Sequence, residues 1–246
     1  METYFNIRYE FDQNAVHNGI RKAVSEKRPG YICVADGNIL SMVHRDMNYR
    51  RTVAESMFAI CDSSWVPLFL RRIYGITRPH YCGAQIFRNI VSAGAYRMAF
   101  LGSKTEVLKD LRTAISAWNP AVENMPFEEL PFLPAEEFNY ATIAAGLNSS
   151  GVDIIWVALG APKQEQFMQR LLPHLESGVM IGVGAVFNFY SGHIRRAPSW
   201  VRSLHLEFLY RIFTEPRKQF ARCSGILATL PSILREEKAC QKTPLV

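Results

Sequence analysis

Short, nearly continuous apolar runs alternate with longer segments of mixed apolar and polar residues along most of this chain. Apolar runs bounded by turn residues predict strands that are buried on both faces of a sheet. Such runs cover residues 31–35, 58–61, 96–101 and 152–159, and another begins at Val179. Because helical segments separate them, we expect an α/β fold: a largely parallel, Rossmann-like sheet with helices on both faces.

Polar and turn residues set the bounds of the other predicted elements. Residues Tyr4–Tyr9 alternate in polarity and predict one strand. Asp12 suits the N-cap of the next helix, which reaches about Lys27. Further helices are predicted over residues 39–57, 65–74, 84–93, 105–118, 136–147 and 162–175, and a short strand within residues 120–134.

The stretch over residues 152–166 predicts a strand, a turn and the start of a helix. Gly160 ends the apolar run, and Lys163, Gln164 and Glu165 stand on the first helical turn, close to the strand's carboxyl end. In open α/β sheets this edge binds ligands. A helix N-terminus also favours phosphate through its unpaired N–H groups and partial positive charge. We therefore predict a binding site here, with a capped, solvated helix start as the alternative.

Two side chains on this turn have different expected roles. On an exposed first turn, Gln164 contributes little to packing, so we expect it to affect the reaction more than stability. Glu165 either interacts favourably with the helix dipole or contacts a sugar hydroxyl, and the structural role is slightly favoured.

Acidic residues and glycines also follow the other predicted strands. Asp36 and Asp62 lie where a carboxylate can face a ligand, although Asp62 suits the N-cap of the next helix equally well. Gly102 opens a Gly-Ser-Lys turn that resembles a nucleotide-binding turn but completes neither common phosphate-binding motif. Gly184 lets the backbone approach another group closely.

Composition indicates a large globular protein of a reducing compartment. With 246 residues, 48% of them hydrophobic, the chain can bury a full core. Its five cysteines form no CxxC pair, which argues against a disulfide framework or a zinc site. We see neither a secretory signal nor an apolar run long enough to span a bilayer, and we therefore expect a cytoplasmic, non-integral protein.

The net charge of +6 is concentrated near the C-terminal end, where residues 193–222 hold seven Lys and Arg against two Glu. We divide the chain into an α/β core, residues 1–198, and a basic amphipathic C-terminal helical appendage, residues 199–246. Apolar residues alternate with arginines in the appendage, a pattern that suits an anionic membrane surface. Packing of its apolar face on the core is the alternative. We expect peripheral association with the inner face of the cell membrane.

Three ordered groups of motifs lie in the last third of the chain. They are Gly160-Ala161-Pro162-Lys163-Gln164-Glu165; Gly182-Val183-Gly184-Ala185-Val186-Phe187 with Gly192 and Arg196-Ala197-Pro198; and Leu206-Glu207-Phe208-Leu209-Tyr210-Arg211 with Glu215-Pro216-Arg217. In order and spacing they resemble the G-x-P-[KR]-Q-E, V-G-x-x-F-D and L-E-W-x-x-R…E-P-x-R motifs of the WecG/TagA/CpsF family of bacterial glycosyltransferases. The amino-terminal two-thirds is similar to the family more loosely.

Some positions depart from the family pattern. Cys61-Asp62-Ser63 falls where the family carries Pro-Asp-Gly, whose Asp is the proposed catalytic base. Val34-Ala35-Asp36 falls near its Thr-x-Asn, and Gly83-Ala84-Gln85 stands where Gly-x-Asp-Leu is usual. Asn188 replaces the family's Asp, which removes a carboxylate near the expected sugar-nucleotide pocket. These departures leave the identity of the donor open.

The resemblance implies an inverting glycosyltransferase that needs no metal and no cofactor. It would move a hexosamine-type sugar, such as N-acetylmannosamine or its uronate, from a UDP-sugar to a polyprenyl-pyrophosphate-linked saccharide in cell-surface polysaccharide synthesis. Asp62 would be the catalytic base. Without a D-x-D metal site, arginines and helix N-termini must neutralise the departing UDP. The predicted substrate-binding residues are Asp36, Gly102, Gly160, Lys163, Gln164, Glu165, Gly184, Asn188, Arg196, Arg211, Arg217 and Arg222.

Other classes of function stay open. A catalytically silent relative that binds a nucleotide-sugar or a lipid-linked sugar is consistent with Asn188. A nucleic-acid binder would use the basic end, but the balanced body gives no support for a nucleic-acid partner. An NAD-linked oxidoreductase would need the G-x-G-x-x-G motif that is missing. The sequence fixes neither the sugar, nor the acceptor, nor whether the chain forms a homo-oligomer.

Overall fold

The computed structural model describes residues 1–63, 65–195, 198 and 216–241, and within these ranges it leaves the side chains of residues 216–222 and 241 undescribed. Its centre is an eight-stranded sheet in the order β1-β2-β4-β3-β8-β7-β5-β6. The strands are β1 (Glu2–Tyr4), β2 (Ile7–Glu10), β3 (Gly30–Ala35), β4 (Phe58–Cys61), β5 (Met98–Gly102), β6 (Phe127–Glu128), β7 (Ile154–Ala158) and β8 (Val179–Gly182). Among these described strands only β1 and β2 pair antiparallel, which confirms the predicted, largely parallel sheet.

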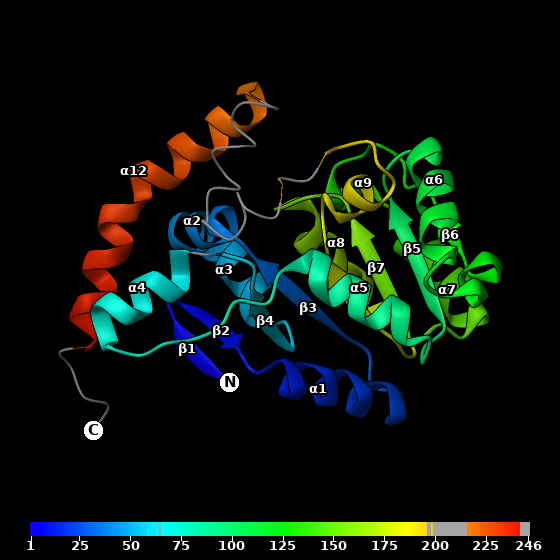
Figure 1. Cartoon of the computed structure of the whole chain (residues 1–246), viewed down its shortest axis with the longest axis horizontal. Coiled ribbons are helices and arrows are strands. Elements are labelled where there is room, and N and C mark those ends of the chain that lie inside the picture. The colour runs from blue at the N-terminus through cyan, green and yellow to red at the C-terminus, as the bar shows by residue number, and fades with distance from the viewer. Residues whose placement is uncertain (64, 196–197, 199–215, 242–246) are drawn as a thin grey trace.

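Helices cover both faces of this sheet (Figure 1). They are α1 (Gln13–Ser25), α2 (Gly37–Arg45), α3 (Met47–Ala54), α4 (Trp65–Tyr74), α5 (Gly83–Ala93), α6 (Thr105–Ser116), α7 (Tyr140–Ser150), α8 (Lys163–Leu171), α9 (Val186–Tyr190) and α12 (Pro216–Gln241). Single 3₁₀ turns are η1 (Pro120–Asn124), η2 (Ala135–Glu137) and η3 (Leu172–His174).

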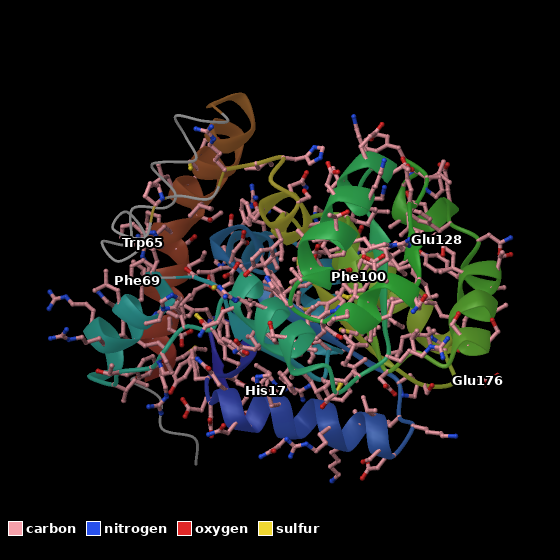
Figure 2. The ribbon with its side chains drawn as sticks, turned by 45° about the vertical axis from the view of Figure 1, so that its right-hand side comes forward. His17, Trp65, Phe69, Phe100, Glu128 and Glu176 are labelled. Carbon is pink, nitrogen blue, oxygen red and sulfur yellow. The ribbon has the colours of Figure 1, made fainter. Side chains whose placement is uncertain are left out.

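Two hydrophobic cores result, one on each face, because successive residues of a strand point to opposite sides. In β3, Tyr31 and Cys33 enter the core formed with α2, α3, α4, α7 and α8, whereas Ile32 and Val34 enter the core formed with α1, α5, α6 and α9. Phe100 of β5 lies in the second core (Figure 2). Its ring stacks on that of Phe127, with 4.3 Å between the ring centroids. Burial on both faces explains why the strands β3, β4, β5, β7 and β8 are continuous apolar runs.

Three predicted elements differ from the structure, each because of a local turn or cap. The single strand over Tyr4–Tyr9 is instead the β1–β2 hairpin, since Phe5 and Asn6 both have positive φ, as a two-residue type I′ turn requires. The helix over residues 39–57 is divided into α2 and α3 at Asp46, whose carboxylate accepts hydrogen bonds from the first amides of α3. The helix predicted from residue 136 starts at Tyr140, behind an Asn139 cap.

The predicted cap of the first helix is confirmed. The Asp12 carboxylate accepts a hydrogen bond from the Asn14 amide at 2.9 Å, and α1 follows directly.

The C-terminal helix α12 packs against α2 and α4 at the end of the molecule opposite β6 (Figure 1). Ser41 and Thr229 hydroxyls lie 2.8 Å apart, and the buried Glu237 carboxylate accepts hydrogen bonds from the Phe5 amide and the Tyr74 hydroxyl. Ile233 is buried in the first core. The last helix is therefore joined to the core by packing and by buried hydrogen bonds. The boundary at residue 198 stays a prediction.

No helix among the described residues is long and apolar enough to cross a membrane.

Candidate active site

The carboxyl ends of five parallel strands bring most of the predicted site residues to one edge of the sheet. Strands β3 and β8 are neighbours at its centre, and the helices after them, α2 and α9, pack on opposite faces. From β3 the chain continues to β4 on one side, and then crosses to β5 on the far side of β8 and β7. Such a reversal of strand order opens a crevice for ligands at the carboxyl ends.

Asp62 follows β4 and is half-buried. Its Oδ1 accepts a hydrogen bond of 3.1 Å from the amide of Gly83, the first residue of α5. The Ser63 hydroxyl accepts a hydrogen bond from the first amide of α4, that of Trp65. The alternative role of Asp62 as the N-cap of α4 stays a prediction. A carboxylate at the N-terminus of α5 is stabilised in its charged form by the helix dipole.

Asp36 follows β3, the strand next to β4. Its carboxylate accepts hydrogen bonds from the amides of Asn38 and Ile39 at 2.9 and 3.0 Å, and so caps α2. Asp36 therefore has a structural role, and its contact with substrate stays a prediction.

Gln164 is the main correction to the sequence-based interpretation of this site. It lies on the first turn of α8, but only 4% of its surface is exposed, so the prediction of an exposed side chain with little packing is wrong. Its Oε1 accepts a hydrogen bond from the Gly160 amide at 3.2 Å, and its Nε2 donates to Glu165 at 2.7 Å. A side chain at Gly182 would come within 3.1 Å of the same Nε2. Gln164 thus fills the space between the ends of β7 and β8.

Glu165 is completely buried on the same turn. Its Oε2 accepts a hydrogen bond of 3.0 Å from the Tyr49 hydroxyl, which α3 supplies. The pKa of this carboxyl is raised to about 7, mainly by burial and to a smaller extent by the negative charge of Asp36, against the lowering effect of its hydrogen bonds. Glu165 is therefore a hydrogen-bond acceptor inside the protein. Tyr49 was not predicted as a site residue, because it lies within the segment predicted as one long helix.

Lys163 extends from α8 toward aromatic side chains. Its Nζ lies 5.1 Å from the ring centroids of both Phe132 and Phe138, a cation–π arrangement, and Phe132 is fully exposed. A contact between Lys163 and phosphate stays a prediction.

The glycines of the site allow backbone conformations and contacts that side chains would prevent. Gly102 has φ +94°, and a Cβ there would lie 2.9 Å from the carbonyl oxygen of Ala158 on β7. Gly160 and Gly184 have φ of +77° and +55°. In the αL region of backbone space a residue with a side chain is unfavourable.

The remaining predicted residues are only partly described. Asn188 lies half-buried in α9, where its carbonyl accepts a hydrogen bond from the Ile194 amide. Arg196 and Arg211 lie outside the described residues. Arg217 and Arg222 lie in α12, but their side chains are not described.

Two surface hollows lie elsewhere. One, of about 510 Å³, borders α7 and η3, and one, of about 300 Å³, lies between the β1–β2 turn and α12. Neither is lined by the residues at the strand ends, where ligands bind in folds of this class.

This fold, with carboxylates and glycine turns at the carboxyl ends of its strands, is that of an α/β protein whose ligand site lies at the strand ends. The chain belongs to the WecG/TagA/CpsF family of glycosyl transferases, whose family model matches residues 4–243. It is therefore a glycosyltransferase.

Two relatives carry the same name, N-acetylglucosaminyldiphosphoundecaprenol N-acetyl-beta-D-mannosaminyltransferase. The one from Bacillus subtilis (strain 168) is 25% identical over 248 residues, covering 96% of this chain and 92% of the relative. The one from Bacillus spizizenii (strain ATCC 23059 / NRRL B-14472 / W23) is 23% identical over 222 residues, covering 89% of this chain and 84% of the relative.

Proposed function

We propose that this enzyme transfers a hexosamine-type sugar, such as N-acetylmannosamine or its uronate, from a UDP-sugar to a polyprenyl-pyrophosphate-linked saccharide. The reaction inverts the anomeric centre, needs no metal and serves cell-surface polysaccharide synthesis. The names of both relatives support this choice, since they specify an N-acetylmannosaminyl group and an acceptor linked through diphosphate to undecaprenol. The enzyme works at the cytoplasmic face of the membrane, where it attaches peripherally.

One observation carries the proposal: Asp62 stands at the carboxyl end of β4, beside the strand-end turns of the central crevice. Asp62 takes the proton of the acceptor hydroxyl while that oxygen forms a bond to the anomeric carbon. The bond between this carbon and the UDP oxygen breaks, and UDP leaves with the electron pair. A general base of this kind contributes about 10²- to 10⁴-fold to the rate. The hydrogen bond from the Gly83 amide orients the carboxylate and stabilises its charged form.

The departing diphosphate also needs neutralisation. Arginines match phosphate oxygens in a bidentate way, and the candidates are the basic residues near the C-terminal end, Arg196, Arg211, Arg217 and Arg222. The glycine turns after β5, β7 and β8 leave backbone close to the crevice, where N–H groups can donate to phosphate.

The test is a product assay on the full-length chain. A panel of UDP-hexosamines and their uronates is combined with N-acetylglucosamine linked through pyrophosphate to a short prenyl chain. We expect UDP release that requires both substrates, continues in EDTA, and yields a disaccharide of inverted anomeric configuration. Donor binding without turnover for every sugar in the panel would contradict the proposed reaction and favour a catalytically silent relative.

A further inference from the structure

Glu165 is an ionisable group buried without a cationic partner. Its exposed fraction is 0%, and it forms no salt bridge with any described residue. The titratable groups whose charges interact with it come from the neighbouring elements. They are Tyr49 of α3, Tyr31 and Cys33 of β3, and Asp36 after β3. None of these is a cation, so the negative charge of Glu165 is supported by hydrogen bonds and by the positive end of the α8 dipole.

Both side chains bonded to Glu165 donate. Tyr49 donates its hydroxyl proton to Oε2 at 3.0 Å, and Gln164 donates an amide hydrogen to Oε1 at 2.7 Å. Since the Gln164 amino group faces Glu165, its Oε1 is left to accept the hydrogen bond from Gly160. A continuous chain of hydrogen bonds therefore runs from α3, through Glu165 and Gln164, to the turn after β7.

This arrangement is suited to the ionised carboxylate. A carboxylate has only acceptor atoms and satisfies both donors, whereas a protonated carboxyl adds a third hydrogen between the same groups. A proton on Oε1 would face the Gln164 amino group, which cannot accept it, and Gln164 cannot turn without releasing the Gly160 amide. A proton on Oε2 can be accepted by the Tyr49 hydroxyl, whose own hydrogen then loses this acceptor. Burying such a charge lowers stability. A site selected for packing alone would be expected to hold a neutral side chain.

We propose that ionised Glu165 is a positioning residue: by fixing the Gln164 amide, it holds the Gly160–Gln164 turn in the conformation that receives the diphosphate end of the nucleotide-sugar. This inference rests on the proposed function for the nature of the ligand. A buried carboxyl, without touching substrate, thereby sets the shape of the donor site and makes donor affinity depend on pH. The raised pKa of about 7 places this dependence near neutral pH.

The experiment measures UDP binding by calorimetry, and the donor KM and kcat, from pH 5.5 to 8.5. Wild type is compared with Glu165→Gln, Tyr49→Phe and the control Glu176→Gln. Glu176 is exposed at the surface (Figure 2), and its replacement by Gln removes a carboxylate in the same way. If only the ionised form is competent, about a tenth of wild type is competent at pH 6, and UDP affinity falls roughly tenfold relative to pH 8.

The variants are expected to separate positioning from packing. Glu165→Gln should bind UDP weakly at every pH while its melting temperature at pH 8 rises. Tyr49→Phe removes one donor to the carboxylate and should move the midpoint of the pH profile upward. Glu176→Gln should match wild type.

Two results would overturn the inference: Glu165→Gln with wild-type UDP affinity and an unchanged pH profile, or wild type whose UDP affinity does not change with pH. Failure of the proposed reaction gives a different result, since UDP then binds with the expected pH dependence but no donor in the panel is turned over. If wild type does not bind UDP at pH 8, both the inference and the proposed function are wrong.

Discussion

Replacing Glu165 by Gln should stabilise the protein above neutral pH. The folded state raises the pKa of this carboxyl from 4.5 to about 7, so folding favours the protonated form. Ionisation therefore costs no stability below about pH 4.5, an increasing amount between pH 4.5 and 7, and a constant amount above that range. Each unit of pKa corresponds to about 1.4 kcal/mol, which makes the full cost about 3 kcal/mol. Gln keeps the shape of the side chain and cannot ionise.

The assay is urea unfolding of wild type and Glu165→Gln at pH 5 and pH 8. Any fixed difference in hydrogen bonding between the two side chains is the same at both values, so the change with pH isolates the charge. We expect the stability of the variant relative to wild type to increase by about 2–3 kcal/mol between pH 5 and pH 8. For a chain of this length, that corresponds to a shift in melting temperature of roughly 4–10 °C.

The control Glu176→Gln should show no such change, because that side chain is exposed. A variant whose stability relative to wild type is the same at pH 5 and pH 8 would refute the reasoning. It would mean that water or structural relaxation supports the charge of Glu165 in the folded state.

Four further predictions concern the reaction and the basic end. Asp62→Asn should lower turnover by about a hundredfold to ten-thousandfold with the fold and donor binding retained; near-normal kcat at saturating acceptor would favour Asp36 as the base. Gln164→Ala leaves buried partners unpaired, so urea unfolding should show a loss of about 1–3 kcal/mol together with lower activity. Arg211→Ala and Arg217→Ala should each slow turnover of a soluble acceptor, whereas full rates would exclude a catalytic role. Deletion from residue 199 onward should abolish salt-sensitive flotation with anionic vesicles, and a truncated chain that still floats would contradict the membrane role.

Strand positions could be predicted because burial on both faces forces continuous apolar runs, as in β4, which matches residues 58–61. The prediction that Asp62 and Gly160 share one sheet edge also followed, since parallel strands end at the same edge. The points at which a helix is interrupted were harder to predict from the sequence. Asp46 lies within a helical pattern, and only its capping of α3 shows that the chain prefers a break there.

The burial of Gln164 and Glu165 could not be predicted, because local sequence does not say which side of a first helical turn faces the core. Two polar residues at a helix start usually face water. Here α3 packs against α8, and its Tyr49 hydroxyl supplies a partner for Glu165 from 116 residues earlier in the chain. The residue types show that Gln164 and Glu165 need hydrogen-bond partners when buried, but tertiary packing decides which groups those partners are.

Tertiary packing also shows how the C-terminal helix α12 is joined to the core, which the charge pattern could not indicate. The distribution of charge divides the chain near residue 198, but α12 packs on α2. A side chain at Gly37 would place its Cβ 3.4 Å from the Cδ1 atom of Ile226 in α12. Gly37 is the residue directly after Asp36, so α12 is fixed against the helix that begins at the candidate site. The basic segment that leads into α12 is therefore tied at its end to an element of the site. The proposed use of its arginines, on lipid headgroups and on the pyrophosphates of the substrates, needs such an anchor, because the segment must stay beside the site while it meets the membrane.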